Sequence, residues 1–209
     1  MANTEEFDLK RSQIIDCAEQ LFISEGYEMT TIDNILKKLG IAKGTFYHYF
    51  NSKEEVMDAV ISKHINEEMK YANAISSNVE MKPTEKLFAV LFRKTKSTEK
   101  KEMLERMFEA ENALMKQKAM LNTLKFVCPI YESIIIEGNR TKYFSSCNPL
   151  SDIQFLMTGL QTLYDLSNVR ESTITFDIDS MVEIMFRVLK INTSKTSKKS
   201  VKKLILETL

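Results

Sequence analysis

Residues 40–53, GIAKGTFYHYFNSK, decide the fold of this chain together with residues 26–35, GYEMTTIDNI. Gly40 separates two short segments with helical apolar spacing, residues 32–39 and 43–50. Two short helices joined by a tight glycine-containing turn and packed on a preceding helix form a helix-turn-helix. The two stretches therefore predict this motif, with Gly40 allowing the backbone to turn sharply.

The preceding helix is indicated by an apolar stripe that stops at Gly26. Its residues, spaced as on one face of an amphipathic helix, are Ile14, Ala18, Leu21 and Phe22. In the third helix, Phe46 and Phe50 lie four residues apart and therefore share a face. We expect this face to pack inward against the other two helices.

Capping residues mark where the second and fourth helices begin. Thr30 and Thr31 offer a threonine cap for the second helix, with the acid Asp33 three residues after Thr30. Ser52 and Glu55 have the spacing of a capping box and open a long helix that runs to about residue 75.

The rest of the chain also has a helical pattern. The further expected helices cover about residues 83–92, 98–114, 121–138, 149–168 and 177–191. Pro129 lies inside one of them, so that segment either kinks or consists of two helices that meet. Residues 173–176 resemble a strand but have no partner strand in the sequence, so we interpret them as an extended connector. Five glycines and three prolines are too few turn-makers for a sandwich, barrel or doubly wound sheet, and the predicted fold class is all-α.

We predict three parts: a helix-turn-helix DNA-binding domain at residues 1–52, a helical regulatory and dimerisation domain at residues 53–192, and a Lys-rich C-terminal tail at residues 193–209. Five lysines against one glutamate make the tail typical of a mobile, solvated end. One alternative is a last helical turn or two that docks through Val201, Leu204, Ile205 and Leu206. Non-specific attraction of the tail to DNA is another alternative.

The net charge of the chain is zero, with 29 basic and 29 acidic residues, so it gives no indication of a polyanionic partner. Single segments differ from this average. Residues 1–28 carry two basic and seven acidic residues, a net charge of −5, whereas residues 29–53 carry four lysines and one aspartate, a net charge of +3. The positive charge is therefore local to the predicted helix-turn-helix.

The side of the third helix opposite its phenylalanines presents Lys43, Gly44, Tyr47 and His48 to solvent. Ammonium, hydroxyl and imidazole donors all suit phosphate oxygens. The missing side chain of Gly44 lets the helix N-terminus approach a duplex closely. This face favours DNA binding, and the alternative is a three-helix packing unit whose exposed lysines only solubilise it.

Residues 26–35 and 40–53 resemble the DNA-binding signature of the TetR family of transcriptional regulators. The resemblance lies within residues 10–56, roughly the first quarter of the chain, and the family's spacing is kept without a gap. The departures are Leu36 and Leu39, where the family usually has alanine. Both remain apolar, so they bear on helix packing more than on DNA contact.

The resemblance implies roles for eight positions. Those expected to meet phosphates are Thr31, Tyr47, His48, Tyr49 and Lys53. Those expected at base edges in the major groove are Lys43, Gly44 and Thr45. A lysine suits guanine O6 and N7 and the threonine methyl suits a thymine methyl, but a lysine at this position could equally bind phosphate.

The resemblance also implies a helical domain that dimerises through its last two long helices, here about residues 150–168 and 177–191, and that often holds a small-molecule pocket. Two-fold pairing would let two recognition helices reach successive major grooves about 34 to 36 Å apart. The candidate pocket residues are Phe88, Phe92, Met107, Phe108, Glu111, Phe126, Tyr131, Met157, Gln161 and Tyr164. The polar residues Asn112 and Asp165 lie on or near the same faces. Ordinary core packing is the alternative for the Met and aromatic side chains.

Other classes of function find little support in the sequence. The N-terminus is acidic and lacks the apolar region of a signal peptide. We also expect no membrane span, because the most apolar stretches, such as residues 134–136, are far shorter than the about 20 residues that cross a bilayer. Three scattered cysteines, Cys17, Cys128 and Cys147, fit reduced thiols in a cytoplasm. No nucleophile elbow, P-loop, dinucleotide fingerprint or zincin motif is present, so we expect no enzyme, no catalytic residue, no metal and no cofactor.

The sequence therefore predicts a homodimeric, cytoplasmic, all-helical transcriptional regulator with no membrane partner. More specifically, it predicts a repressor that a small-molecule effector releases from a palindromic double-stranded DNA operator. One alternative is a regulator of the same family without a small ligand. The other is a helical small-molecule-binding or interaction module whose helix-turn-helix is only structural.

Overall fold

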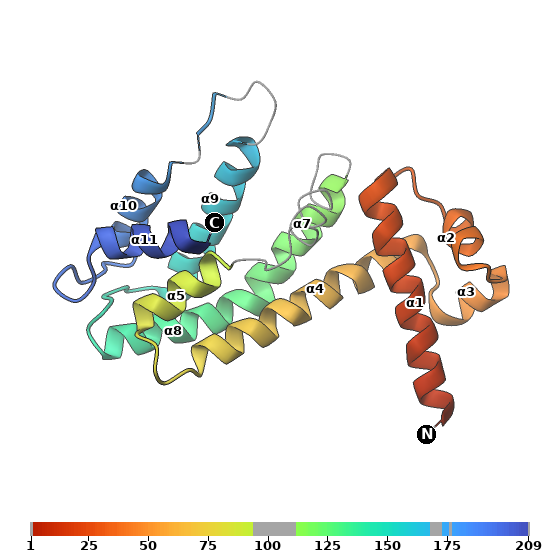
Figure 1. Ribbon diagram of the computed structural model, residues 1–209, viewed down its shortest axis with the longest axis horizontal. Helices are drawn as coiled ribbons and strands as arrows, with labels where there is room; N and C mark the ends of the chain where they lie inside the picture. The colour runs from red at the N-terminus through yellow and green to blue at the C-terminus, as the bar shows by residue number, and fades with distance from the viewer. Residues whose placement is uncertain (1, 94–111, 168–172, 176, 209) are drawn as a thin grey trace. The chain divides into compact units, whose positions relative to one another are not determined.

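The computed structural model describes residues 2–93, 112–167, 173–175 and 177–208, and within these ranges it contains helices and no strand (Figure 1). The elements are α1 (Ala2–Glu25), α2 (Ile32–Leu39), α3 (Lys43–Tyr49), α4 (Lys53–Ser76), α5 (Pro83–Leu91), α7 (Ala113–Asn122), the π-helical turn η2 (Thr123–Val127), α8 (Cys128–Arg140), α9 (Pro149–Ser167), α10 (Ile178–Val188) and α11 (Lys198–Thr208). The all-α prediction is confirmed. Residues 173–175 form no regular element, as expected for a connector, and Phe176 lies outside the described residues.

The chain forms two compact units. Unit 1 contains α1, α2, α3, the first part of α4 and α7, within the described residues 2–66 and 112–122. Unit 2 contains the end of α4, then α5, η2, α8, α9, α10 and α11. The two units divide α4 between Asn66 and Glu67, whereas the predicted boundary at Ser52 falls just before this helix. The three-part division of the chain stays a prediction.

Unit 1 has an apolar core to which each of its first four helices contributes. The core side chains without exposed surface include Ile14, Ala18, Phe22, Ile35, Phe46, Val56, Met57 and Val60. Phe50, which follows α3, is 1% exposed, so both phenylalanines of the expected inward face are buried. Burying one such ring stabilises the folded state by about 1.5 to 3 kcal/mol.

Unit 2 is organised around α8, which packs against both α5 and α9. Tyr131, Ile134 and Ile135 on this helix are buried. At its end the chain folds back so closely that a Cβ added to Gly138 would lie 2.1 Å from Cδ2 of Phe144. Glycine is therefore required at this position for the turn to close.

A π-helical turn joins α7 to α8 just before Pro129. Proline has no N–H to donate and its ring clashes with the carbonyl four residues earlier, so an α-helix cannot continue unchanged through it. The π-helical turn adapts the backbone where α8 begins, with Pro129 in its first turn. Of the two expectations, the meeting of two helices describes this segment better than a kinked α-helix.

The run Ala113–Arg140 is long and apolar enough to cross a membrane by length and composition alone, with a mean hydropathy of 1.3 in its most apolar window. Lysines such as Lys116, Lys118 and Lys125 interrupt it, so it does not stand out as an unbroken apolar segment of the sequence. Such a run is weak evidence for a membrane, since core helices of soluble proteins pass the same test. The absence of a membrane partner stays a prediction.

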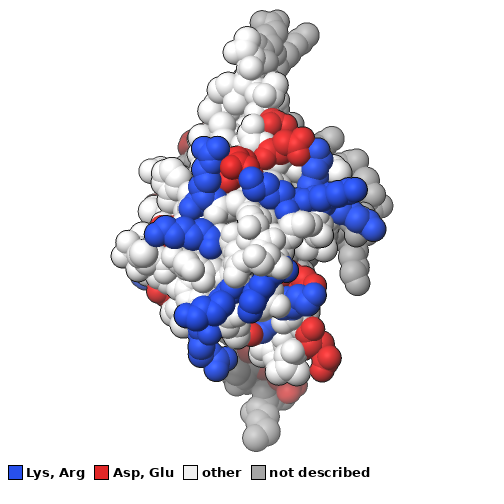
Figure 2. Space-filling view, turned by 90° about the vertical axis from the view of Figure 1, so that its left-hand side faces the viewer, with Lys and Arg blue, Asp and Glu red and all other residues white. Residues whose placement is uncertain are grey.

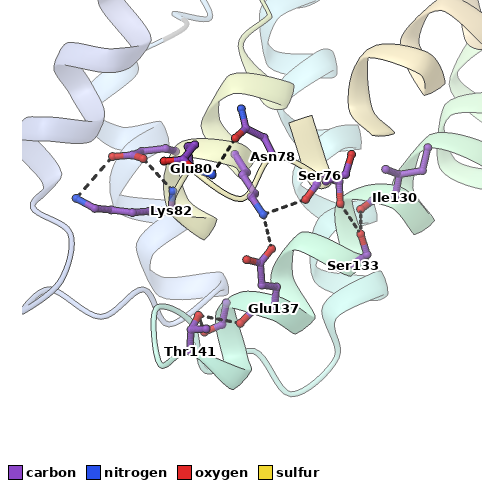
Figure 3. Close-up of polar contacts among 12 residues, drawn as sticks. Ser76, Asn78, Glu80, Lys82, Ile130, Ser133, Glu137 and Thr141 are labelled. Atoms are coloured by element: carbon purple, nitrogen blue, oxygen red, sulfur yellow. Dashed lines mark hydrogen bonds and ion pairs between the residues drawn. The ribbon is translucent and has the colours of Figure 1, made fainter. Parts of the chain in front are cut away.

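A buried lysine ties three helices of unit 2 together through Ser76 and Glu137, which are labelled in Figure 3. Lys86 on α5 is 3% exposed, and its Nζ donates to the carbonyl oxygen of Ser76 at 2.9 Å and to Oε2 of Glu137 at 2.7 Å. Ser76 is the last residue of α4, so the lysine satisfies a carbonyl that the helix leaves unpaired. Hydroxyl contacts between Ser76 and Ser133, 3.0 Å apart, add a second link between α4 and α8.

The C-terminal lysine-rich segment is a docked helix. In α11, Val201 is 2% exposed and Ile205 is fully buried, and the helix packs against α10 and α5. Lys198 pairs with Glu183, and Nζ of Lys202 lies 2.6 Å from Oδ2 of Asp179. The structure therefore disagrees with the interpretation of residues 193–209 as a mobile tail. It agrees with a docked helical end, in which Val201 and Ile205 are buried but Leu206 is 54% exposed.

Candidate nucleic-acid interface

Helix α2 begins at an exposed threonine. The hydroxyl oxygen of Thr31 accepts the N–H of Asn34 at 3.2 Å, and the side-chain oxygen of Asn34 accepts the N–H of Thr31 at 2.8 Å. Thr30 is buried instead, and its hydroxyl donates to the carbonyl of Gly26 at 2.7 Å. The predicted threonine cap is confirmed, but its reciprocal partner is Asn34 rather than the acid Asp33. Asparagine fits this role because its amide oxygen also accepts a backbone N–H.

The turn between α2 and α3 depends on Gly40. Its φ of 64° and ψ of 34° lie in the left-handed region, where a side chain would be strained. The N–H groups of Gly40 and Ile41 both donate to the carbonyl of Leu36, which ends α2 within one residue. The chain then passes through an extended Ala42 into α3. This geometry forms the predicted helix-turn-helix.

Helix α3 has one buried and one open side. Its exposed residues are Lys43, Gly44, Tyr47 and His48, and its half-buried ones include Thr45 and Tyr49. A Cβ added to Gly44 would meet no atom within 4 Å, so packing inside the chain does not require glycine there. Lys43, Tyr47 and His48, three of the residues predicted for the interface, therefore share one accessible face of α3.

Lys53 lies at the start of α4 and is held by the chain itself. Its Nζ donates to the carbonyl oxygen of Tyr27 at 2.7 Å and lies 4.2 Å from the centre of the Tyr27 ring. A weaker contact joins it to the carbonyl of Glu28 at 3.4 Å. An ammonium group has three donors, so this predicted phosphate ligand also fastens the segment between α1 and α2.

Asn112 also holds this segment. Its side-chain oxygen accepts the N–H of Tyr27 at 2.7 Å, and its Nδ2 donates to the carbonyl of Phe22 at 3.2 Å. The residue is 2% exposed. The sequence prediction puts Asn112 near a ligand pocket and does not include this role, because no local pattern marks a hydrogen bond across 85 residues of chain.

An aromatic contact between α1 and α3 is also absent from the sequence predictions. The ring of Phe7 lies 5.5 Å from that of His48 and 4.6 Å from that of Tyr49, between ring centres. One turn further along α1, the guanidinium carbon of Arg11 lies 4.8 Å from the centre of the Phe50 ring. The signal that could have revealed this contact is the helical spacing of Phe7, Arg11 and the buried Ile14.

A buried carboxylate joins α1 to α4 in unit 1. Glu19 is 4% exposed, and its oxygens lie 2.7 Å from Nζ of Lys63 and 2.5 Å from Nε2 of His64. Nζ of Lys63 also lies 2.7 Å from Oδ1 of Asp16. Burial raises the pKa of Glu19, but the hydrogen bonds and charges of His64 and Lys63 outweigh burial and leave this pKa below its ordinary value. The carboxylate is therefore charged when the domain is folded at neutral pH.

The candidate pocket residues of unit 2 differ in how deeply they are buried. Phe88, Phe92 and Tyr131 are buried, with the rings of Phe88 and Phe92 stacked at 6.3 Å. The hydroxyl of Tyr131 donates to Glu68 at 3.0 Å, and burial raises the pKa of this phenol. Phe126 is 42% exposed.

The remaining candidates, Met157, Gln161 and Tyr164 on α9, are half-buried. Nε2 of Gln161 donates to Oδ1 of Asp165 at 2.9 Å. Met107, Phe108 and Glu111 lie outside the described residues. A pocket of about 310 Å³ in unit 2 is lined by other residues, from Lys82 to Glu85 and from Lys195 to Leu204. The predicted ligand pocket stays a prediction.

Basic side chains also gather over α10, α11 and the neighbouring turns of unit 2 (Figure 2). Acidic side chains lie among them, and those of Asp179 and Glu183 pair with lysines of α11. Charge on this face is therefore partly neutralised within the chain. Within the described ranges, no group of three or more His, Cys, Asp or Glu residues could hold a metal ion.

In this unit a glycine turn joins the short helices α2 and α3, which pack on α1, and the open face of α3 carries hydrogen-bond donors. This arrangement defines a helix-turn-helix protein. Residues 14–60 match the family model described as bacterial regulatory proteins, tetR family. The helix-turn-helix of this chain is therefore of the TetR type.

The sequence relatives match over short parts of the chain. An uncharacterized HTH-type transcriptional regulator in the lacX 3′ region of Lactococcus lactis subsp. lactis is 42% identical over 55 residues, which are 26% of this chain and 28% of the relative. The HTH-type transcriptional repressor KstR2 of Rhodococcus jostii (strain RHA1) is 30% identical over 76 residues, 36% of this chain and 37% of the relative. The matches thus span only about a quarter to two fifths of these relatives.

Solved structures resemble almost the whole chain. SmeT, the repressor of the Stenotrophomonas maltophilia multidrug efflux pump SmeDEF, matches with a TM-score of 0.67 and 19% identity over 91% of this chain and 95% of that chain. RolR in complex with resorcinol matches with a TM-score of 0.65 and 14% identity over 97% of this chain and 95% of that chain. At these identities the likeness concerns the fold.

Proposed function

We propose that this chain is a sequence-specific DNA-binding transcriptional regulator that binds a palindromic operator as a homodimer in the cytoplasm. More specifically, we propose a repressor that a small-molecule effector releases from DNA. The observation that carries the proposal is the open face of α3, which presents Lys43, Gly44, Tyr47 and His48 from a helix-turn-helix of the TetR family.

Each interface residue has a proposed role. Lys43, Gly44 and Thr45 lie at the start of α3 and would face base edges, with Gly44 allowing close approach. The phosphate contacts would come from Thr31, Tyr47, His48, Tyr49 and Lys53. The capped and exposed N-terminus of α2 supports Thr31, and the three donors of the Lys53 ammonium support its double role.

Exposed apolar side chains on α9 and α10 support the dimer. Phe155 is 67% exposed, and Leu166 and Ile184 are 39% and 40% exposed. Apolar side chains of this size are normally buried against something, and these lie on the two helices through which we expect dimerisation. A second copy of the chain would cover them.

The aromatic side chains of unit 2 and the likeness of its fold to RolR, which was crystallised with resorcinol, support a small-molecule effector. In this proposal the effector prefers the conformation that binds DNA less well, so it shifts the population away from the operator. A regulator without a small ligand is the alternative. Titration of the protein with candidate aromatic compounds would distinguish the two by a ligand-dependent rise in melting temperature.

Electrophoretic mobility shift with fragments of genomic DNA tests the DNA-binding proposal. A regulator should retard a discrete fragment, and its affinity should fall with rising salt by roughly 0.9 log units per phosphate contact per log unit of salt. The matched control is Lys43→Ala, which should retard the same fragment more weakly. Failure of the wild-type protein to retard any fragment would leave the helix-turn-helix as a structural element only.

A further inference from the structure

The first turns of α1 lie outside the part of the chain that matches the family model. The match begins at Ile14, whereas α1 begins at Ala2. In this N-terminal extension, Phe7, Lys10 and Arg11 are half-buried, while the neighbouring Glu5, Glu6, Asp8 and Leu9 are exposed. The half-buried residues are spaced as on one helix face, and the ring contacts of Phe7 and Arg11 show that this face meets α3 and its C-cap.

The contact of Phe7 is with two residues of the proposed DNA interface. Its ring lies edge-on to His48, with an interplanar angle of 79°, and tilted by 39° against Tyr49. His48 and Tyr49 in turn meet edge to face at 5.0 Å. Three rings in mutual contact restrict one another's rotamers, which lowers the entropy cost when the two α3 side chains bind a ligand.

The polar atoms of these two side chains remain available. Among the residues that the structure describes, none makes a hydrogen bond to the hydroxyl of Tyr49 or to a ring nitrogen of His48. The core beneath them is already closed, since Phe46 and Phe50 are 0% and 1% exposed. Phe7 therefore orients side chains at the rim of the domain rather than filling its core.

We propose that Phe7 is a positioning residue of the DNA interface, which holds the rings of His48 and Tyr49 so that their polar atoms meet phosphate oxygens of the operator. This inference rests on the proposed function. It extends the interface to a part of α1 that the family model does not include. Phe7 itself makes no DNA contact in this arrangement and acts through the two α3 side chains.

The test compares wild-type protein with Phe7→Ala and Phe7→Leu. The probe is a duplex that wild-type protein selects from a random-sequence library, and its Kd is measured over a range of salt concentrations. Leu9→Ala is the matched control, because Leu9 lies on the same helix and is 62% exposed. Thermal unfolding of each variant shows whether the domain remains folded, and Phe7→Leu keeps an apolar side chain if the alanine variant does not fold.

We expect Phe7→Ala to weaken binding about tenfold, the equivalent of one to two ordinary hydrogen bonds. Phe7→Leu should weaken it less, and Leu9→Ala should bind as the wild type does. The salt dependence of Phe7→Ala should become shallower by about 0.9 log units for each phosphate that the variant no longer binds, a change that a purely structural defect would not produce. In a His48→Ala/Tyr49→Phe background, Phe7→Ala should have almost no further effect.

Two results would overturn the inference. In the first, the Phe7→Ala protein binds the probe as tightly as wild type and with the same salt slope. In the second, Phe7→Ala weakens binding as much in the His48→Ala/Tyr49→Phe background as it does in the wild type. Selection of no duplex by wild-type protein would instead refute the proposed function, and the inference with it. The two kinds of failure are therefore distinguishable.

Discussion

Replacing Glu19 with glutamine should lower the free energy of unfolding by about 3 kcal/mol at neutral pH. Glu19 is 4% exposed and is the shared partner of Lys63 and His64. Breaking a buried pair by removing one partner typically costs about 3 to 5 kcal/mol. We expect the cost to lie at the lower end of this range, because the side chain of Lys63 is 38% exposed and keeps Asp16 as a partner.

Asp16→Asn provides a matched control for this prediction. Asp16 and Glu19 each lie 2.7 Å from the same Nζ of Lys63, but the Asp16 side chain is 50% exposed and that of Glu19 is 5% exposed. An exposed pair contributes about 0 to 1 kcal/mol, because water screens it. Urea denaturation followed by circular dichroism should therefore separate the two variants by at least about 2 kcal/mol.

The same experiment has a pH arm. The pKa of Glu19 is lowered in the folded protein, so its stabilising effect is present above the ordinary value of 4.5 and is lost as the pH falls through the lower folded pKa. The difference between wild type and Glu19→Gln should shrink over that acid range. Equal stability of Glu19→Gln and Asp16→Asn at neutral pH would refute the reasoning that burial, rather than distance, sets the strength of these pairs.

Further predictions concern DNA contact, the α1–α2 segment, the thiols and the C-terminal helix. If Lys43 reads a base, Lys43→Ala should weaken specific binding by about 1 to 3 kcal/mol and relax the preference at one operator position in a binding-site selection. A uniform weakening over all sequences would instead make Lys43 a phosphate contact. Lys53→Met removes the donor to a backbone carbonyl and should lower stability by about 1 kcal/mol in thermal melts, and an unchanged melting curve would contradict this. Iodoacetamide at neutral pH should modify the exposed Cys147 and spare Cys128, because burial raises the pKa of Cys128 to about 11. Peptide mass mapping measures this, and modification of Cys128 before Cys147 would contradict the prediction. Deleting residues 193–209 should lower the unfolding temperature, because it uncovers α10 and α5. DNA affinity at low salt should stay unchanged. A drop in that affinity would instead support non-specific attraction of this segment to DNA.

The helix-turn-helix could be predicted from the sequence because its determinants are local. Gly40 and the four-residue spacing of Phe46 and Phe50 act within a turn or two of the chain, and the structure places all three as expected. The C-terminal segment shows the opposite case. Its composition favours a mobile end, yet Val201 and Ile205 lie four residues apart and provide a single apolar face, which is enough for α11 to dock.

The peptide at Tyr27 shows why the remaining features could not be predicted. Its N–H is held by Asn112, 85 residues away, and its carbonyl by Lys53, 26 residues away. Neither partner differs in type or spacing from many other asparagines and lysines of the chain, so only their placement in the folded unit reveals the role. The same two contacts fix where α1 ends and α2 begins, and thus the base on which the turn and α3 are built. Residues 26–53 therefore carry the signature of the motif but do not account for its structure alone, because side chains from α4 and from just before α7 hold its first turn in place.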